Sequence, residues 1–567
     1  MVPGLTNLAI PSPPEPRLPW PAQVNCRAAP PDHRSVAGQP ETGEHMRRRD
    51  TREHQRPGVV LARYPVTVLA ALVLALSVAG GCSRGGPASR SGPVNPVSVE
   101  NAQAGTLTWR LTEKTTDDIA KQIAGYASAT SVNIGEEITF QVTVNPAQDY
   151  SIDIYRMGYY QGLGGRLMRH VQDVPGIHQP DCPMDHLTGL VACGWAPGYR
   201  LTIPPGWTSG VYLAKLTNAA GFASYIIFTV RDDARHADLL YQQSVTTYQA
   251  YNAWPRDTPG ASGHPATGKS LYEDGSSLAP IGLGPPRAVM VSFDRPYAKN
   301  NGAGDFLDWE FYYLRWLEKS GYDVAYSTDL DTHRNGRILR NYKGFLSVGH
   351  DEYWTREMYD NVTAARDAGV NVGFFGADAV YWQIRMAPSA AGVPDRIQVC
   401  YKDAALDPVK GPTSTVLWRD PPAARPEQQL IGVQFTSAQP SESAPAAFVP
   451  AGVENSLYHG SGATAATPSG HVVGYEADRQ FSGSPLPDSV PGTYALLSDS
   501  PYLNDDGRID HQNSVIYQAR SGAWVFGAGS IEWSWGLYDD ARHHEADPVI
   551  QRVTANVLDR FVRPAQP

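Results

Sequence analysis

Residues 344–354 have the sequence GFLSVGHDEYW, in which an apolar run ends at a glycine and three ionisable side chains follow. The run 344–348 predicts a buried strand, and residues 355–368 predict the helix after it, with Thr355 as its cap and Gly369 as its end. In open α/β sheets, functional groups gather at the carboxyl ends of the strands. The stretch therefore predicts both a parallel sheet and a site at the edge of that sheet.

Strand and helix patterns alternate on both sides of this stretch. Further strands are expected at residues 288–293, 322–326, 370–375 and 524–529, and further helices at 306–320 and 548–561. This alternation predicts a doubly wound α/β domain with parallel strands over residues 234–567.

The preceding residues, 100–233, have a different pattern of apolar and polar residues. Apolar and polar residues alternate at 138–144, 150–155, 210–216 and 224–230, between clusters of Gly, Pro, Asn and Asp. Several such strands in series predict an Ig-like β-sandwich, so we expect a multidomain chain. The Gly- and Tyr-rich segment 155–166 is expected to pack against the neighbouring domain rather than to contact a ligand.

The N-terminus resembles an export signal. Residues 1–45 are rich in Pro and Arg and are interpreted as an over-extended, disordered start, whereas 46–82 combine a basic segment with the uncharged run 64–81. Small residues before Cys82 resemble a lipobox, with Ala79 in place of the usual Leu, which predicts lipidation of Cys82. The alternative is an uncleaved signal-anchor helix. Residues 83–99 are predicted to be a tether, and the protein to be extracytoplasmic, either membrane-anchored or secreted.

Composition and the positions of the cysteines exclude some classes of function. The chain has 47 Lys+Arg against 57 Asp+Glu, a net charge of −10, which argues against a nucleic-acid partner. Outside the cytoplasm, Cys182 and Cys193 are natural disulfide partners. Cys400 is expected to be a small buried hydrophobe rather than a nucleophile, because no histidine pairs with it in the sequence.

His350, Asp351 and Glu352 are the residue types that a hard metal or acid–base catalysis requires. The structural alternative is that Asp351 or Glu352 caps the following helix, but capping needs one acidic residue and no histidine. A tyrosine-rich segment upstream, which includes Tyr248, Tyr251 and Tyr272, is by composition expected to line the core or a cleft.

Four motifs together resemble the large (β) subunit of N,N-dimethylformamidase over roughly residues 238–562. They are TYQAYN at 247–252, SLY at 270–272, VGHDEYW at 348–354 and GADAVYW at 376–382. The resemblance implies a fold similar to class I glutamine amidotransferases and a mononuclear ferric ion (Fe3+) held by two tyrosinates and one glutamate. It assigns Glu352 and Tyr272 as ligands, and Tyr251, or alternatively Tyr248, as the second phenolate.

The same resemblance places His350, Lys402 and Glu476 near the metal as further polar groups, with His350 or Glu476 passing a proton to the leaving amine. Asp378 stands where the family is expected to carry Asn. The family's lectin-like insertion has no room in this chain, and its small partner subunit is not part of it.

Two functions follow as hypotheses. The first is a metal-dependent hydrolase of a linear, non-peptide C–N amide bond at the cell surface, acting on a small amide; ferric ion favours such anionic oxygen ligands, which neutralise its charge. The second is a non-catalytic, envelope-binding lipoprotein with a degenerate enzyme domain.

Overall fold

The structure is a computed structural model of the 567-residue chain, and it describes residues 95–111, 114–256, 268–272, 287–440, 443–540 and 542–563. The predictions for residues 1–45, for the export signal 46–82 and for Cys82 lie outside these residues. The chain divides into two compact units, Met1–Ala88 and Ser89–Pro567, and every described residue belongs to the second. Within the described ranges, no helix combines the length and apolar character needed to cross a membrane.

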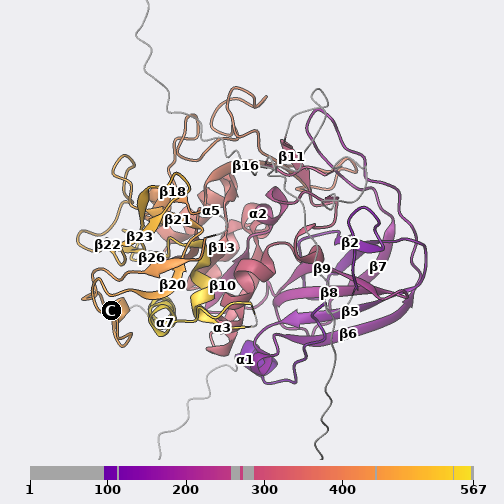
Figure 1. Cartoon of the computed structure of the whole chain (residues 1–567), viewed down its shortest axis with the longest axis horizontal. Coiled ribbons are helices and arrows are strands. Elements are labelled where there is room, and N and C mark those ends of the chain that lie inside the picture. The colour runs from indigo at the N-terminus through magenta and orange to yellow at the C-terminus, as the bar shows by residue number, and fades with distance from the viewer. Residues whose placement is uncertain are drawn as a thin grey trace, which may run out of the picture. The chain divides into compact units, whose positions relative to one another are not determined.

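A seven-stranded sheet forms the centre of this unit (Figure 1). Its strand order is β12 (Val324–Thr328), β10 (Leu239–Gln243), β13 (Gly344–His350), β15 (Asn371–Ala377), β26 (Trp524–Gly527), β25 (Val515–Gln518) and β22 (Ala495–Leu496). The first five strands run parallel, β25 runs antiparallel to β26, and β22 runs antiparallel to β25. Four of the parallel strands coincide with sequence-predicted strands; β10 does not, because its two buried glutamines interrupt the apolar pattern.

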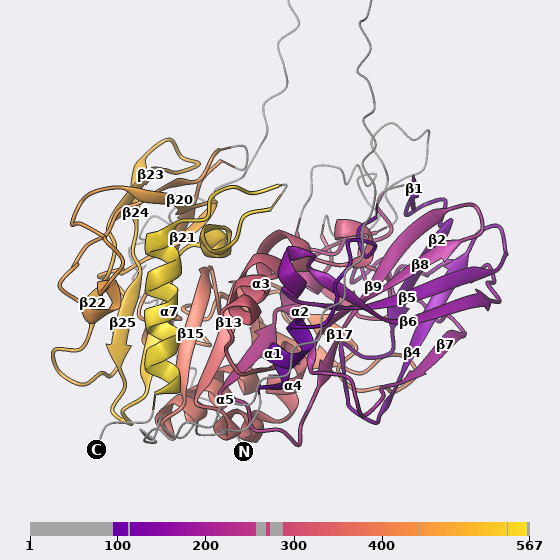
Figure 2. The same ribbon diagram turned by 90° about the horizontal axis from the view of Figure 1, so that it is seen from below.

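Helices cover both faces of this sheet because successive side chains of each strand point to opposite sides. On β13, Leu346 and Val348 share a core with α3 (Phe311–Lys319) and α7 (Pro548–Val562), and α7 lies along β15 in Figure 2. Phe345 faces the other way, into a core shared with α5 (Arg356–Asp367). The helix predicted at 306–320 begins as a wider π-helical turn, Phe306–Glu310, before α3.

The placement predicted for residues 288–293 is wrong. Strand β11 (Met290–Ser292) pairs antiparallel with β17 (Ile397–Val399), in a separate four-stranded sheet with β16 (Trp382–Ala387) and β14 (Tyr353–Thr355). An apolar run predicts burial but does not specify which sheet the strand joins.

Smaller elements complete this part of the chain. Short helices are α2 (Val245–Ala250), α4 (Asp329–Arg334) and α6 (Gln428–Ile431). Three two-stranded sheets pair β18 (Gln434–Ala438) with β21 (Glu476–Arg479), β19 (Ala446–Phe448) with β20 (Ser469–Val473), and β23 (Ser500–Leu503) with β24 (Ile509–Gln512).

Two further sheets form what we call the N-terminal β region. One contains β1 (Lys114–Thr115), β3 (Ser131–Asn133), β5 (Tyr150–Met157), β6 (Gly165–Val174), β8 (Gly210–Asn218) and β9 (Phe222–Arg231); the other contains β2 (Ile123–Ala127), β4 (Glu137–Val144) and β7 (Pro197–Thr202). Both contribute side chains to one hydrophobic core, among them Phe140 and Ile154. A disulfide joins Cys182 to Cys193 between β6 and β7, and Cys400 is buried and free. We propose that these sheets are the predicted sandwich; the likeness of the parallel sheet to class I glutamine amidotransferases stays a prediction.

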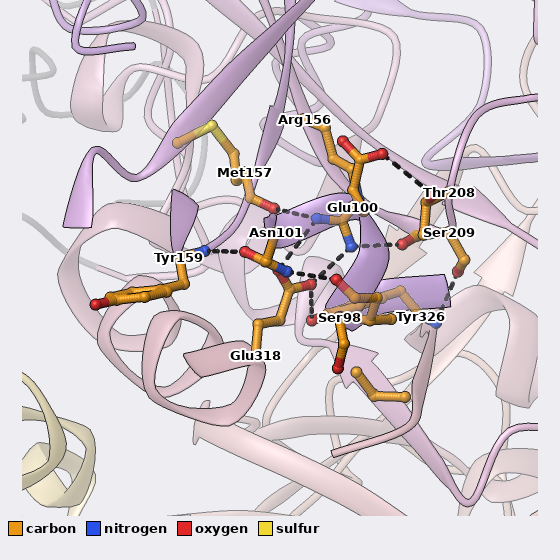
Figure 3. A network of polar contacts seen from close by, with 12 residues as sticks. Ser98, Glu100, Asn101, Arg156, Met157, Tyr159, Thr208, Ser209, Glu318 and Tyr326 are labelled. Carbon is orange, nitrogen blue, oxygen red and sulfur yellow. Dashed lines mark hydrogen bonds and ion pairs between the residues drawn. The ribbon is translucent and has the colours of Figure 1, made fainter. Parts of the chain in front are cut away.

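A buried polar network joins the N-terminal β region to helix α3 (Figure 3). Arg156 Nη2 lies 2.7 Å from Glu318 Oε1, and neither side chain is exposed to solvent. Tyr326 Oη and Asn101 Nδ2 donate to the same carboxylate, each at 2.7 Å. Asn101 ends helix α1 (Pro96–Asn101), so residues 96–99 of the predicted tether are helical. The Gly- and Tyr-rich segment 155–166 thus contacts the neighbouring region through Arg156.

Candidate metal centre

Glu352 is presented by a sharp turn at the carboxyl end of β13. Gly349 has a φ of +71°, and a Cβ at this position would lie 2.7 Å from Trp309 Cβ, so the turn requires glycine. The backbone N–H of Glu352 donates to Thr247 Oγ1 at 2.9 Å. Its carboxylate is buried, with 1% of the residue exposed.

The capping alternative does not hold, because the cap of α5 is Thr355, whose hydroxyl accepts from the N–H of Met358. Asp351 instead anchors the turn: its carboxylate accepts from Ser347 Oγ at 2.7 Å and from Trp354 Nε1 at 2.7 Å. Glu352 is therefore left to face the site.

Two tyrosine hydroxyls meet the carboxylate of Glu352. Tyr251, directly after α2, donates from Oη to Oε2 at 2.9 Å, and Tyr272 Oη donates to the other oxygen, Oε1. Their rings stack with centroids 4.4 Å apart. Three oxygen-bearing groups that are far apart in the sequence thus converge at one buried place.

Tyr248, the sequence alternative to Tyr251, points elsewhere. Its hydroxyl donates to the carboxylate of Glu310, which also accepts from Tyr241 Oη at 2.9 Å. Burial raises the pKa of Glu310 to about 8. Of the two candidates, only Tyr251 lies against Glu352.

His350 lies between two carboxylates. Its Nε2 is 3.2 Å from Glu352 Oε2 and 3.0 Å from Glu476 Oε2, at the start of β21. Neither contact has hydrogen-bond geometry, and among the described residues His350 Nε2 and Glu476 Oε2 have no hydrogen-bond partner. Burial alone would lower the pKa of His350, but Glu476 and Glu352 outweigh it and raise that pKa to about 10.

Lys402 and Asp378 complete the predicted set. Lys402 Nζ lies 3.4 Å from the centroid of the Tyr272 ring, and burial lowers the pKa of this ammonium to about 8 although Glu352 opposes the shift. Asp378 is buried, and its Oδ1 has no hydrogen-bond partner in the described part of the chain. Donor atoms of His350, Glu352 and Asp378 lie within 4.8 Å of one another. All the residues that the resemblance assigned to the site, except the alternative Tyr248, therefore lie around Glu352.

Sequence reasoning missed Lys299. Its Nζ lies 5.0 Å from the centroid of the Tyr251 ring and 2.6 Å from Asp305 Oδ1. Lys299 begins a turn in which Asn300 and Asn301 have positive φ values. The residues KNNG at 299–302 are a recognisable turn signal, but nothing in the sequence links that turn to the site.

The residues fit a hard cation. Burial, followed by the charge of Glu352, raises the pKa values of Tyr251 and Tyr272 well above their usual range, so both phenols remain protonated unless a metal cation binds their oxygens. Phenolate and carboxylate oxygens are hard ligands that suit such an ion. The unpartnered, buried atoms of His350, Glu476 and Asp378 around the same place also fit a site built for a ligand.

Residues 151–546 match the family described as "N,N-dimethylformamidase beta subunit-like, C-terminal". The match covers well over half of the chain and begins within β5, so it extends further toward the N-terminus than the resemblance over 238–562. No curated protein matches the chain. One solved structure, a Paenibacillus sp. cycloisomaltooligosaccharide glucanotransferase complexed with cycloisomaltoheptaose, has a TM-score of 0.15 and 10% identity, over 71% of this chain and 66% of that chain, and carries no argument. On the strength of the match over residues 151–546, the chain belongs to the N,N-dimethylformamidase beta subunit-like family.

Proposed function

We propose that this protein is a ferric-iron-dependent hydrolase of a small, non-peptide amide, working at the cell surface. The observation that carries the proposal is that the hydroxyls of Tyr251 and Tyr272 contact different oxygens of one buried carboxylate, Glu352. Membership of a dimethylformamidase-like family suggests a hydrolase. The metal, the substrate class and the location are our extension of that membership.

Tyr251, Tyr272 and Glu352 would hold the ferric ion, since two phenolates and a carboxylate together neutralise its three charges. When bound, the ion polarises the amide carbonyl and lowers the pKa of water. A packing role alone gives no reason for these three groups to converge in the interior.

We assign the proton transfer to Glu476 and His350. Hydrolysis adds the hydroxyl of water to the carbonyl carbon and its proton to the departing nitrogen, so one group must accept this proton and pass it on. Glu476 Oε2 has no hydrogen-bond partner among the described residues and is placed to accept it. His350 Nε2 lies 3.0 Å from the same oxygen and is the second candidate to protonate the amine.

The test of the metal site is metal analysis together with a visible spectrum. We expect about one iron per chain and a tyrosinate-to-ferric charge-transfer band, and both should be lost in Glu352→Gln. The matched control is Glu357→Gln on α5, whose side chain is 59% exposed and which should keep both. Amine release from a panel of small N-substituted amides measures activity. A colourless, iron-free protein without amidase activity would contradict the proposal and favour the non-catalytic envelope-binding lipoprotein.

The proposed surface location depends on Cys82. Lipidation predicts that Cys82→Ala is released into the medium or stays unprocessed, whereas Cys26→Ala, in the leader, changes nothing. Cell fractionation and intact mass measure both effects. Membrane retention of Cys82→Ala at the same mass as the wild type would favour the signal-anchor helix.

A further inference from the structure

A small cavity lies between the N-terminal β region and the parallel-sheet region. Its volume is about 20 Å³, enough for one occupant the size of a water molecule. Tyr126 of β2 lines one side, and Gln243, Arg295 and Arg396 line the other. This cavity is distinct from the Glu352 centre, because none of the residues proposed for that centre lines it.

Two buried donors at this cavity have no acceptor among the described residues. Arg295 is 1% exposed, and its Nη atoms donate to the backbone carbonyls of Asn252, Trp254 and Lys269, at 2.6, 3.1 and 3.2 Å. Its Nε has no partner among the described residues.

Gln243 is likewise 1% exposed. Its Oε1 accepts from Thr229 Oγ1 at 2.8 Å. Within the described part of the chain, the amide nitrogen Nε2 is left without an acceptor. Buried N–H groups are rarely left in this state, so a bound acceptor is expected.

The charge at the cavity favours an anion over water. Within the described ranges, no carboxylate forms an ion pair with Arg295, whereas the neighbouring guanidinium of Arg396 lies 2.8 Å from Asp294. One positive charge is thus left without a counterion in the described part of the chain, and a buried unpaired charge is unfavourable. A water molecule accepts hydrogen bonds from the donors but does not compensate the positive charge of Arg295.

We propose that the cavity binds a single halide ion, chloride in physiological media, held by the Nε–H of Arg295 and the Nε2–H of Gln243. A halide ion is similar in size to a water molecule, the occupant for which the cavity has room. Because the ion lies between the two regions, its binding stabilises the folded chain and requires no change at the Glu352 centre.

The first test compares thermal unfolding in sodium chloride and in sodium gluconate at equal ionic strength, and locates bromide by anomalous diffraction from crystals grown in sodium bromide. We expect a saturable rise in Tm with chloride that gluconate does not reproduce, and a bromide peak within hydrogen-bond distance of Arg295 Nε and Gln243 Nε2. No anomalous peak in the cavity, or equal Tm values in the two salts, would overturn the proposal.

Gln243→Glu supplies the missing negative charge without changing the size of the side chain. This variant should fold, and its Tm should no longer depend on chloride. The control is Gln179→Glu, at a buried glutamine whose Nε2 already donates to the carbonyls of Val142 and Ala196. Gln179→Glu should lower Tm yet keep the chloride dependence. A chloride dependence that persists unchanged in Gln243→Glu would contradict the site.

Discussion

Tyr248 and Tyr251 are three residues apart at the end of α2, yet their hydroxyls contact different carboxylates. Tyr248 donates to Glu310, and Tyr251 to Glu352. Tyr251 lies just beyond the last helical residue, Ala250. That position lets its ring stack on Tyr272 instead of pointing into the core with Tyr248.

This difference predicts opposite effects for two conservative substitutions. Tyr251→Phe removes one of the oxygens that face Glu352, so iron content or affinity should fall at least about tenfold, roughly 1.4 kcal/mol, and the visible band should shift or vanish. Tyr248→Phe should keep the band but lower the free energy of unfolding by about 1–3 kcal/mol, because Glu310 loses a buried donor. Iron analysis, visible absorption and urea unfolding measure these effects. An unchanged band in Tyr251→Phe would argue against this ligand assignment.

The resemblance ranked Tyr251 ahead of Tyr248, and Tyr251 is the one that lies against Glu352. Both belong to the same six-residue motif, and which ring faces Glu352 depends on where the helix ends, which sequence patterns place only within a few residues. The strand-end motif singled out His350, whereas Glu476 was identified only through the resemblance, because it lies 126 positions away and no local pattern links the two residues. Lys299 was missed for the same reason.

The turn that carries Lys299 is held by a strand of the N-terminal β region. Gly302 has a φ of +104°, and a Cβ there would lie 2.0 Å from the carbonyl oxygen of Tyr225 in β9. Only glycine permits this close approach. The N-terminal β region therefore fixes a turn that borders the Tyr251 ring.

Gly302→Ala should displace this turn and with it Lys299. We expect a shift of the visible band or weaker iron binding, in addition to lower stability. The control is Gly221→Ala, in an exposed turn with a φ of +80° and open space around it. Gly221→Ala should lower the free energy of unfolding by about 1–2 kcal/mol, through backbone strain alone, and leave the visible band unchanged. If both variants keep the wild-type spectrum, the turn does not position the site.

Asp407 holds the loop that follows Lys402. Its carboxylate makes a bidentate pair with Arg385, at 2.7 and 2.8 Å, and accepts from the N–H of Thr415 at 2.7 Å. Burial would raise the pKa of Asp407, but these donors outweigh it and lower that pKa to about 2. A carboxyl whose pKa is lower in the folded than in the unfolded chain stabilises the fold at pH values above about 4, and this contribution disappears as the pH falls toward 2.

Asp407→Asn should therefore lower the free energy of unfolding at pH 7 by about 2–3 kcal/mol, from a pKa difference of about two units. The difference in unfolding free energy between the variant and the wild type should decrease steadily as the pH falls from 4 to 2. Denaturant unfolding at several pH values measures it, with the exposed Asp403→Asn as control. A gap that does not change with pH would show that the carboxylate charge is not the cause.

Sequence patterns predicted which residues form strands better than they predicted which strands pair with one another. The runs that became β12, β13, β15 and β26 are apolar and bounded by turn residues, so local pattern and tertiary position agree. The run that became β11 has the same pattern but pairs with β17 across more than a hundred residues, and that pairing depends on contacts that no local window contains. The side-chain oxygens of Gln242 and Gln243 in β10 accept hydrogen bonds from Thr332 and Thr229, which lie elsewhere in the fold and which no local sequence pattern links to them.

On the scale of the whole molecule, the two regions are joined by charge as well as by apolar contact. Arg156 and Glu318 are 162 residues apart in sequence and form a pair from which solvent is excluded. Glu318 also accepts from Tyr326 and Asn101, so its carboxylate is the centre of the junction. Nothing in either local sequence predicts the pair, because each residue is of a type that is usually exposed.

A double-mutant cycle at this junction tests whether it couples the two regions. Arg156→Met and Glu318→Gln should each lower the free energy of unfolding by about 3–5 kcal/mol, because each leaves buried polar or charged groups without a partner. The double variant should lose clearly less than the sum of the two, since it leaves no unpaired charge. The control is Arg200→Met, which breaks an exposed pair with Glu137 (side chains 62% and 45% exposed) and should cost less than about 1 kcal/mol. Urea unfolding followed by tryptophan fluorescence measures all four variants. Additive losses, or a loss in Arg156→Met no larger than in Arg200→Met, would mean that the buried pair does not hold the N-terminal β region against α3.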